Sequence, residues 1–202
     1  FGSFIGYSAA FPILLYALFP HDEVIRWAFV GPLLGALVRP LGGWLSDRIG
    51  GARVTFWNFA AMLAATIGVL LGLPSGSGSD DATGFVVPFM LLFLTAGIGN
   101  GSVFHVVPTV FRRLHEGLPA AQSEAARNAT ISAGEIEASV ALGFTASLAA
   151  LGLFFIPALV AVSIESTGTP RLALYGFILF YATCLFVTWW WYRRRGAEVR
   201  CD

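Results

Sequence analysis

The chain has 202 residues, of which 56% are hydrophobic and only 12% are charged, and its mean hydropathy is +0.74. Twelve arginines balance twelve acidic residues, so the formal net charge is zero and there is no lysine. This composition excludes an ordinary soluble domain and indicates a membrane protein, and the balanced charge gives no reason to expect nucleic acid as a partner.

Apolar stretches of spanning length follow one another along the whole chain. A helix that crosses a bilayer needs about 20 mostly apolar residues, and this length predicts an all-α membrane protein with six transmembrane helices. We place them near residues 1–19, 27–47, 53–74, 85–111, 136–160 and 171–192, with a tail at 193–202. Because the chain starts inside an apolar run and has no initiator Met, we expect it to be the later part of a longer protein.

The arginines between the predicted spans are unevenly distributed. The 47–53 connector, the polar stretch 112–135 and the tail hold most of them, whereas the opposite side has only Arg26 and Arg171. Short cytoplasmic loops collect Lys and Arg. We therefore expect a multi-pass protein of the cell membrane whose C-terminus faces the cytoplasm.

Arg39 lies in the interior of the second predicted span. At 1.5 Å per residue it is roughly 18 Å from Trp27 and roughly 12 Å from Asp47, which is close to mid-membrane. A charged residue at that depth costs at least about 2.5–3.5 kcal/mol, so its side chain should face a wet cavity or an anion. Its planar fork of donors fits a planar oxyanion. The alternative is a structural arginine that hydrogen-bonds carbonyls freed by Pro32 and Pro40.

The stretch "GGWLSDRIGGAR", residues 42–53, marks a sharp turn between two spans. Its order of residues resembles the cytoplasmic loop signature of the major facilitator superfamily. The resemblance assigns a structural or gating role to Gly43, Asp47, Arg48, Gly50 and Arg53. The alternative is an ordinary positive-inside loop.

Small residues four apart, such as Gly31/Gly35 and Gly97/Gly101, share a helix face and predict close helix packing. Asn100 follows in an apolar span and either lines a pore or makes an interhelical hydrogen bond.

His105 either shuttles protons or is a satisfied histidine near the cytoplasmic end. Cys184 and Cys201 have no metal-ligand or CxxC spacing, so we expect no metal and no cofactor.

Four stretches together resemble one family. "FGSFIGYSAAFP" (1–12), "GPLLGALVRPLGGWLSDRIGGARVTFWNF" (31–59), "GIGNGSVFHVVPTVF" (97–111) and "EASVALGFTASLAALGLFFIP" (137–157) are similar to the NarK-type nitrate/nitrite porters of the major facilitator superfamily. Their order and spacing match the C-terminal six-helix half of that family.

The resemblance implies roles for particular residues. Arg39 matches the arginine that binds the nitrate oxygens, and Phe1 matches an aromatic residue that sandwiches the planar anion. Gly143 and Ala146 fall in the second nitrate signature, where Ala146 stands in place of a serine. Glu137 matches an acidic residue at the start of that helix, and its place at the membrane edge suggests a structural ion pair.

The implied function is a monomeric secondary transporter that exchanges nitrate and nitrite by alternating access. A second arginine would come from the missing N-terminal six-helix half. Transport of another small anion, or of nitrate with protons, is the alternative. A membrane enzyme or a pure anchor is the more remote one, because the sequence shows neither a nucleophile with its base nor a cluster of metal ligands.

Overall fold

The computed structural model describes residues 1–20, 23–74, 82–116 and 124–193, and the regular elements within them are all helical. The helices are α1 (Gly2–Leu18), α2 (Val30–Leu37), α3 (Arg39–Ile49), α4 (Gly51–Leu71), α5 (Thr83–Glu116), α6 (Glu124–Ala150), α7 (Gly152–Thr167) and α8 (Arg171–Thr188). A 3-10 turn, η1 (Glu23–Trp27), precedes α2, and a π-helical turn, η2 (Trp189–Arg193), follows α8. The predicted all-α class is confirmed.

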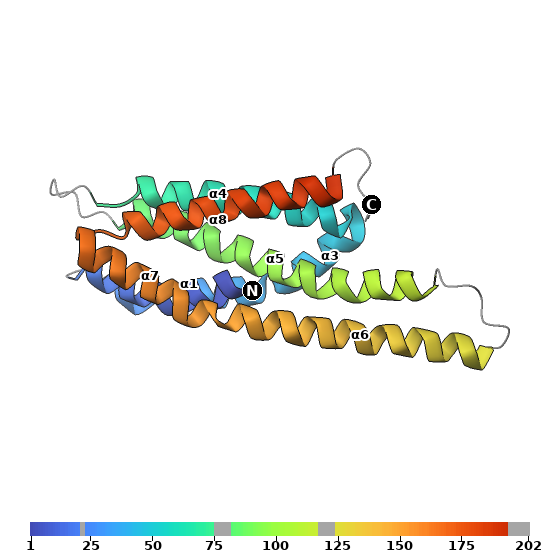
Figure 1. Cartoon of the computed structure of the whole chain (residues 1–202). Coiled ribbons are helices and arrows are strands. Elements are labelled where there is room, and N and C mark those ends of the chain that lie inside the picture. The colour runs from blue at the N-terminus through green and yellow to red at the C-terminus, as the bar shows by residue number, and fades with distance from the viewer. Residues whose placement is uncertain (21–22, 75–81, 117–123, 194–202) are drawn as a thin grey trace.

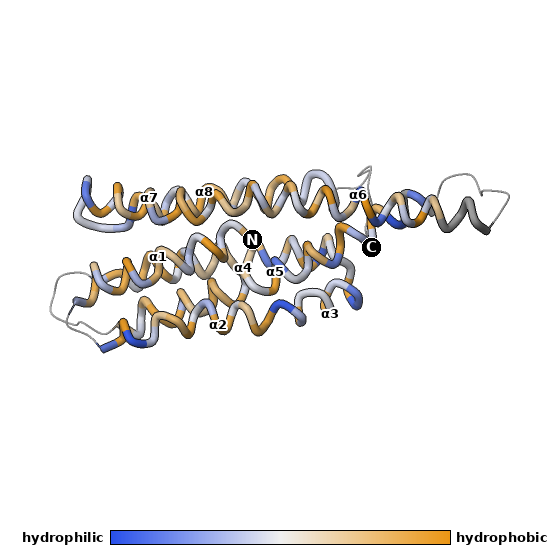
Figure 2. The backbone as a smooth tube through the Cα atoms, turned by 90° about the horizontal axis from the view of Figure 1, so that it is seen from below, coloured by the Kyte–Doolittle hydropathy of each residue, from blue (hydrophilic) through white to orange (hydrophobic). Residues whose placement is uncertain are grey.

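Five helical stretches in the described residues are long and apolar enough to cross a membrane. They are Glu23–Ile49, Gly51–Leu71, Thr83–Arg112, Ala129–Thr167 and Arg171–Trp191, and α1 is a shorter apolar helix of 17 residues. Figure 2 shows hydrophobic residues along most of each helix and hydrophilic residues mainly at the ends of the bundle. This distribution is that of a helical membrane protein.

The helices form an elongated bundle whose members run up and down one long axis (Figure 1). α5 packs on α4, α3, α6 and α2, while α8 packs on α4 and α1 packs on α7. The C-terminal ends of α3, α5 and α8 lie at the same end of the bundle.

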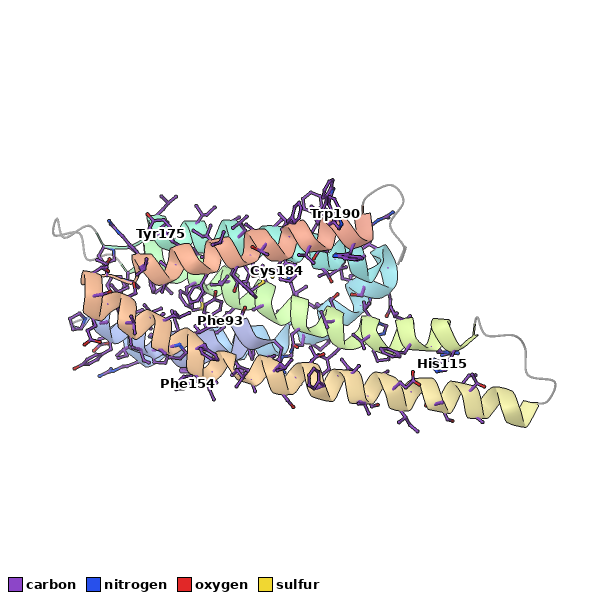
Figure 3. All side chains as sticks on the ribbon, viewed as in Figure 1. Phe93, His115, Phe154, Tyr175, Cys184 and Trp190 are labelled. Carbon is purple, nitrogen blue, oxygen red and sulfur yellow. The ribbon has the colours of Figure 1, made fainter. Side chains whose placement is uncertain are left out.

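Aromatic residues fill the space between α1, α5 and α8. Phe11 stacks on Phe89 with ring centroids 4.6 Å apart, and Tyr7 donates to or accepts from Tyr181 across 2.6 Å. Figure 3 shows Phe93 among the helices, whereas Phe154 of α7 points away from them. The core therefore lies on the α1–α5–α8 side, and α7 turns apolar side chains outward.

The predicted span 27–47 is interrupted at Val38, where α2 ends and α3 begins. Pro40 has no N–H, and its ring blocks a continuous helix at this point. The Leu41 N–H donates to the Val38 carbonyl at 3.0 Å, three residues back, as in a tight turn. Figure 2 shows a hydrophilic stretch at this junction.

The helix that contains the predicted span 136–160 begins at Glu124 and continues, after a break at Leu151, to Thr167. Its first turns contain Glu and Ala, which are good helix formers, so the helix extends beyond its apolar part. Parts of the predicted connectors, residues 21–22, 75–81 and 117–123, lie outside the described residues, as does the tail from residue 194 on.

Candidate functional site

Glycines let α2 and α3 lie directly on α5. A Cβ at Gly97 would meet the carbonyl oxygen of Gly35, and a Cβ at Gly101 would meet the backbone of Arg39. The two backbones are thus in contact, which confirms the close packing predicted from the glycine spacing. The contact between Gly101 and the Arg39 backbone fixes the position of Arg39 relative to α5.

Arg39 is the first residue of α3, directly after the break, and its side chain meets aromatic rings from α1. The guanidinium carbon lies over the Phe4 ring, 4.5 Å from its centroid, and 5.9 Å from the centroid of Phe1. The Phe1 ring makes an edge contact with Phe104 of α5 at 6.0 Å. Two rings therefore lie beside the guanidinium group at the junction of α1, α3 and α5, and Phe104 supports one of them.

The Arg39 Nε is buried and has no hydrogen-bond partner among the described residues. In the same part of the chain no carboxylate forms an ion pair with Arg39. A structural arginine would donate hydrogen bonds to the carbonyls that Pro32 and Pro40 release. The Nε of Arg39 donates no such bond. Buried charged donors are normally paired, so this geometry favours an acceptor supplied from outside the described residues.

Asn100 is the second described residue, after Arg39, with a buried side-chain polar atom that has no partner. It directly precedes Gly101, which touches the Arg39 backbone, and lies one turn before Phe104. Its side chain is 5% exposed, and its Oδ1 has no partner within the described chain. The Asn100 Oδ1 therefore accepts no interhelical hydrogen bond from the described residues.

Gly143 and Ala146 lie on α6, which packs on α5 and α1. A Cβ at Gly143 would have nothing within 4 Å, and Ala146 is half-buried. No interaction described in the structure links either residue to Arg39. The close contact of this helix with α1 lies further along, where Gly2 abuts the Ala149 backbone.

The residues predicted from the signature lie at the α3–α4 junction: Gly50 forms the turn, and the others lie in the adjoining parts of α3 and α4. Gly50 has φ 87° and ψ 133°, a conformation that side chains strongly disfavour. The Arg48 guanidinium carbon lies 4.2 Å from the Trp44 ring centroid, and Asp47 Oδ1 lies 3.4 Å from His105 Nδ1. This contact connects α3 to α5 and favours a satisfied His105 over a proton shuttle.

A cavity of about 270 Å³ lies beside this turn, lined by residues 46–51, Arg53 and the His105–Val110 face of α5. A Cβ at Gly43 would lie 3.8 Å from His105, an ordinary contact, so packing within the described chain does not require glycine there.

Glu137 has a partner at the same end of the bundle. His115 Nε2 lies 3.5 Å from Glu137 Oε2, and Figure 3 shows His115 between α5 and α6. The described residues contain no group of three or more His, Cys, Asp or Glu side chains that could hold a metal ion.

The chain is similar to curated membrane transporters over nearly its whole length. It is 41% identical over 198 residues to the nitrate/nitrite transporter NarU of Salmonella typhimurium and 40% identical to NarU of Escherichia coli, covering 96% of this chain in both. It is 36% identical over 206 residues to the probable nitrate/nitrite antiporter NarK2 of Thermus thermophilus, covering the entire chain. The chain belongs to the NarK-type nitrate/nitrite porters. This NarK-type chain spans about two fifths of the length of these relatives, 42% of each NarU and 41% of NarK2.

No family model matches the chain. Membership in the NarK-type family thus rests on the pairwise similarities, which agree with the resemblance seen in the motifs.

Two residues at the Arg39 site of this NarK-type chain are absent from the sequence-based prediction. Phe4 lies three residues after Phe1, so the helical repeat places both on one face of α1. Phe104 lies in the motif that contains Asn100. Both positions were visible as aromatic residues, but their contacts depend on how α1, α3 and α5 pack.

Proposed function

We propose that the chain is the C-terminal half of a secondary transporter that moves nitrate, nitrite or both across the cytoplasmic membrane by alternating access, in exchange mode. The observation that carries the proposal is the Arg39 guanidinium, which lies inside a span with a buried and unpaired Nε beside two aromatic rings. Arginine offers forked donors in one plane, which match two oxygens of a planar oxyanion. The names of the relatives support the same anions.

The other half of the site would come from an N-terminal six-helix bundle of the same chain. The spans Glu23–Ile49 and Ala129–Thr167 support this arrangement, because only 11% of their most apolar residues are buried, against 44% in Thr83–Arg112. Related six-helix halves line a common cavity in this superfamily. A second cation in that cavity would repel Arg39 when the site is empty, and a bound anion would relieve the repulsion and allow closure.

The α3–α4 junction, with Gly43, Asp47, Arg48, Gly50 and Arg53, would act on the cytoplasmic side as a structural or gating element. The contact between Asp47 and His105 supports this role, since it connects the turn to α5. The arginine distribution supports a cytoplasmic C-terminus. We further propose that the transporter acts as a monomer, is not an enzyme and needs no cofactor.

Uptake of labelled nitrate by vesicles loaded with nitrite tests this proposal with the full-length protein. Arg39→Lys keeps the charge but loses the fork, so exchange should slow by at least about tenfold. Arg26→Lys is the matched control, because Arg26 lies in an exposed turn, 3.4 Å from Glu23. If Arg39→Lys exchanges nitrate as fast as the parent, Arg39 does not bind the anion through its forked donors.

A further inference from the structure

The guanidinium group of Arg39 lies over the ring of Phe4. Its guanidinium carbon is 4.5 Å from the centroid of Phe4, and no carboxylate forms an ion pair with it in the described part of the chain. The negative face of an aromatic ring attracts a cation within about 6 Å of its centroid. Phe4 therefore stabilises the charge of Arg39 without neutralising it.

The Phe4 ring is held in a fixed place. It is 7% exposed and makes an edge contact with Phe93 at 6.3 Å. Gly35 provides the space for it, because a Cβ at Gly35 would meet the Phe4 ring. A ring enclosed by backbone on one side and by a second ring on another provides a rigid surface for the guanidinium.

The Phe4 ring attracts the guanidinium through its charge and provides no lone pair that its N–H donors would need to share. The five N–H donors of arginine point outward in the plane of the group. A carboxylate in the place of Phe4 would occupy those same N–H donors and compete with an incoming anion. An aromatic ring holds the orientation and leaves the donors open.

We propose that Phe4 is a positioning residue for the anion site: its buried ring orients the Arg39 guanidinium and keeps the forked donors free for a planar oxyanion. This inference rests on the function proposed above. Phe4 acts on the anion through Arg39, so its loss should weaken anion binding more than it slows the movement of the helices.

The test replaces Phe4 by pentafluorophenylalanine in the full-length transporter. Fluorination keeps the ring in place but removes its negative face, so the KM for nitrate in the exchange assay should rise by about tenfold. The maximal exchange rate and the melting temperature should stay close to those of the parent. An unchanged KM would overturn the inference.

Phe11 provides the matched control. It lies on the same helix, is 1% exposed and stacks on Phe89 at 4.6 Å, away from the described contacts of Arg39. The same replacement at Phe11 should leave the KM unchanged. A second variant, Phe4→Leu, keeps an apolar side chain without a ring and should raise the KM in the same way. Equal KM changes at both positions would mean that the effect comes from core packing.

The two proposals can fail separately in this assay. If Arg39→Lys exchanges normally, the proposed anion site is wrong. If Arg39→Lys is impaired while both Phe4 variants retain the parent KM, the anion site stands and only the positioning role of Phe4 is wrong.

Discussion

The carbonyl oxygen of Arg39 occupies the space that a Cβ at Gly101 would need. Because the obstacle is backbone, no side-chain rotation can relieve it, and α3 would have to move off α5. The position of Arg39 thus depends on Gly101, a residue without a side chain on the neighbouring helix α5.

Gly101→Ala should therefore destabilise the full-length protein by about 1–3 kcal/mol, the usual cost of overpacking a close contact. It should also slow nitrate exchange, since Arg39 moves with α3. Thermal unfolding in detergent and the exchange assay measure the two effects. Gly176→Ala on α8 is the control, because a Cβ there would have nothing within 4 Å. Normal stability and exchange in Gly101→Ala would show that the helices are not in contact at this point.

Asn100→Leu should slow transport without lowering stability. The Asn100 Oδ1 is buried without a partner among the described residues. An apolar side chain of similar shape removes that unsatisfied group, so the melting temperature should stay the same or rise. If Asn100 contributes to the anion site, exchange should fall. A lower melting temperature with normal exchange would instead identify Asn100 as a structural residue.

Tyr7 and Tyr181 connect α1 to α8 through their hydroxyl groups, which lie 2.6 Å apart and are buried. Tyr7→Phe and Tyr181→Phe should each cost about 1 kcal/mol, because each leaves the other hydroxyl without this bond. The double variant should cost clearly less than the sum of the two. Unfolding of the two single variants and the double variant gives this coupling, and strictly additive losses would contradict a direct bond.

The helical class and the apolar spans followed from sequence because length and hydropathy decide them locally. The break at Val38 was not predicted, although Pro40 releases carbonyls in this span. Span length and hydropathy do not reveal a tight turn inside an apolar run. Likewise, the helical start of α6 at Glu124 was not predicted, since a polar stretch can be helical without being in the membrane.

The site was predictable only in part. Arg39 stood out because a charge within an apolar span is costly wherever the chain folds. Phe1 was connected to it by resemblance, and the structure places the two 5.9 Å apart. The position of the Phe4 ring depends on the space that Gly35 leaves free on the neighbouring helix. No local sequence pattern reveals such a contact between two helices.

Binding of nitrate to the purified full-length protein tests the central claim most directly. A ligand that binds the folded state raises its melting temperature in a saturable way. The parent should show this rise with nitrate, and Arg39→Lys should require at least about tenfold more nitrate for the same rise, because it lacks the forked donors. An Arg39→Lys variant that nitrate stabilises at the same concentrations as the parent would contradict the account.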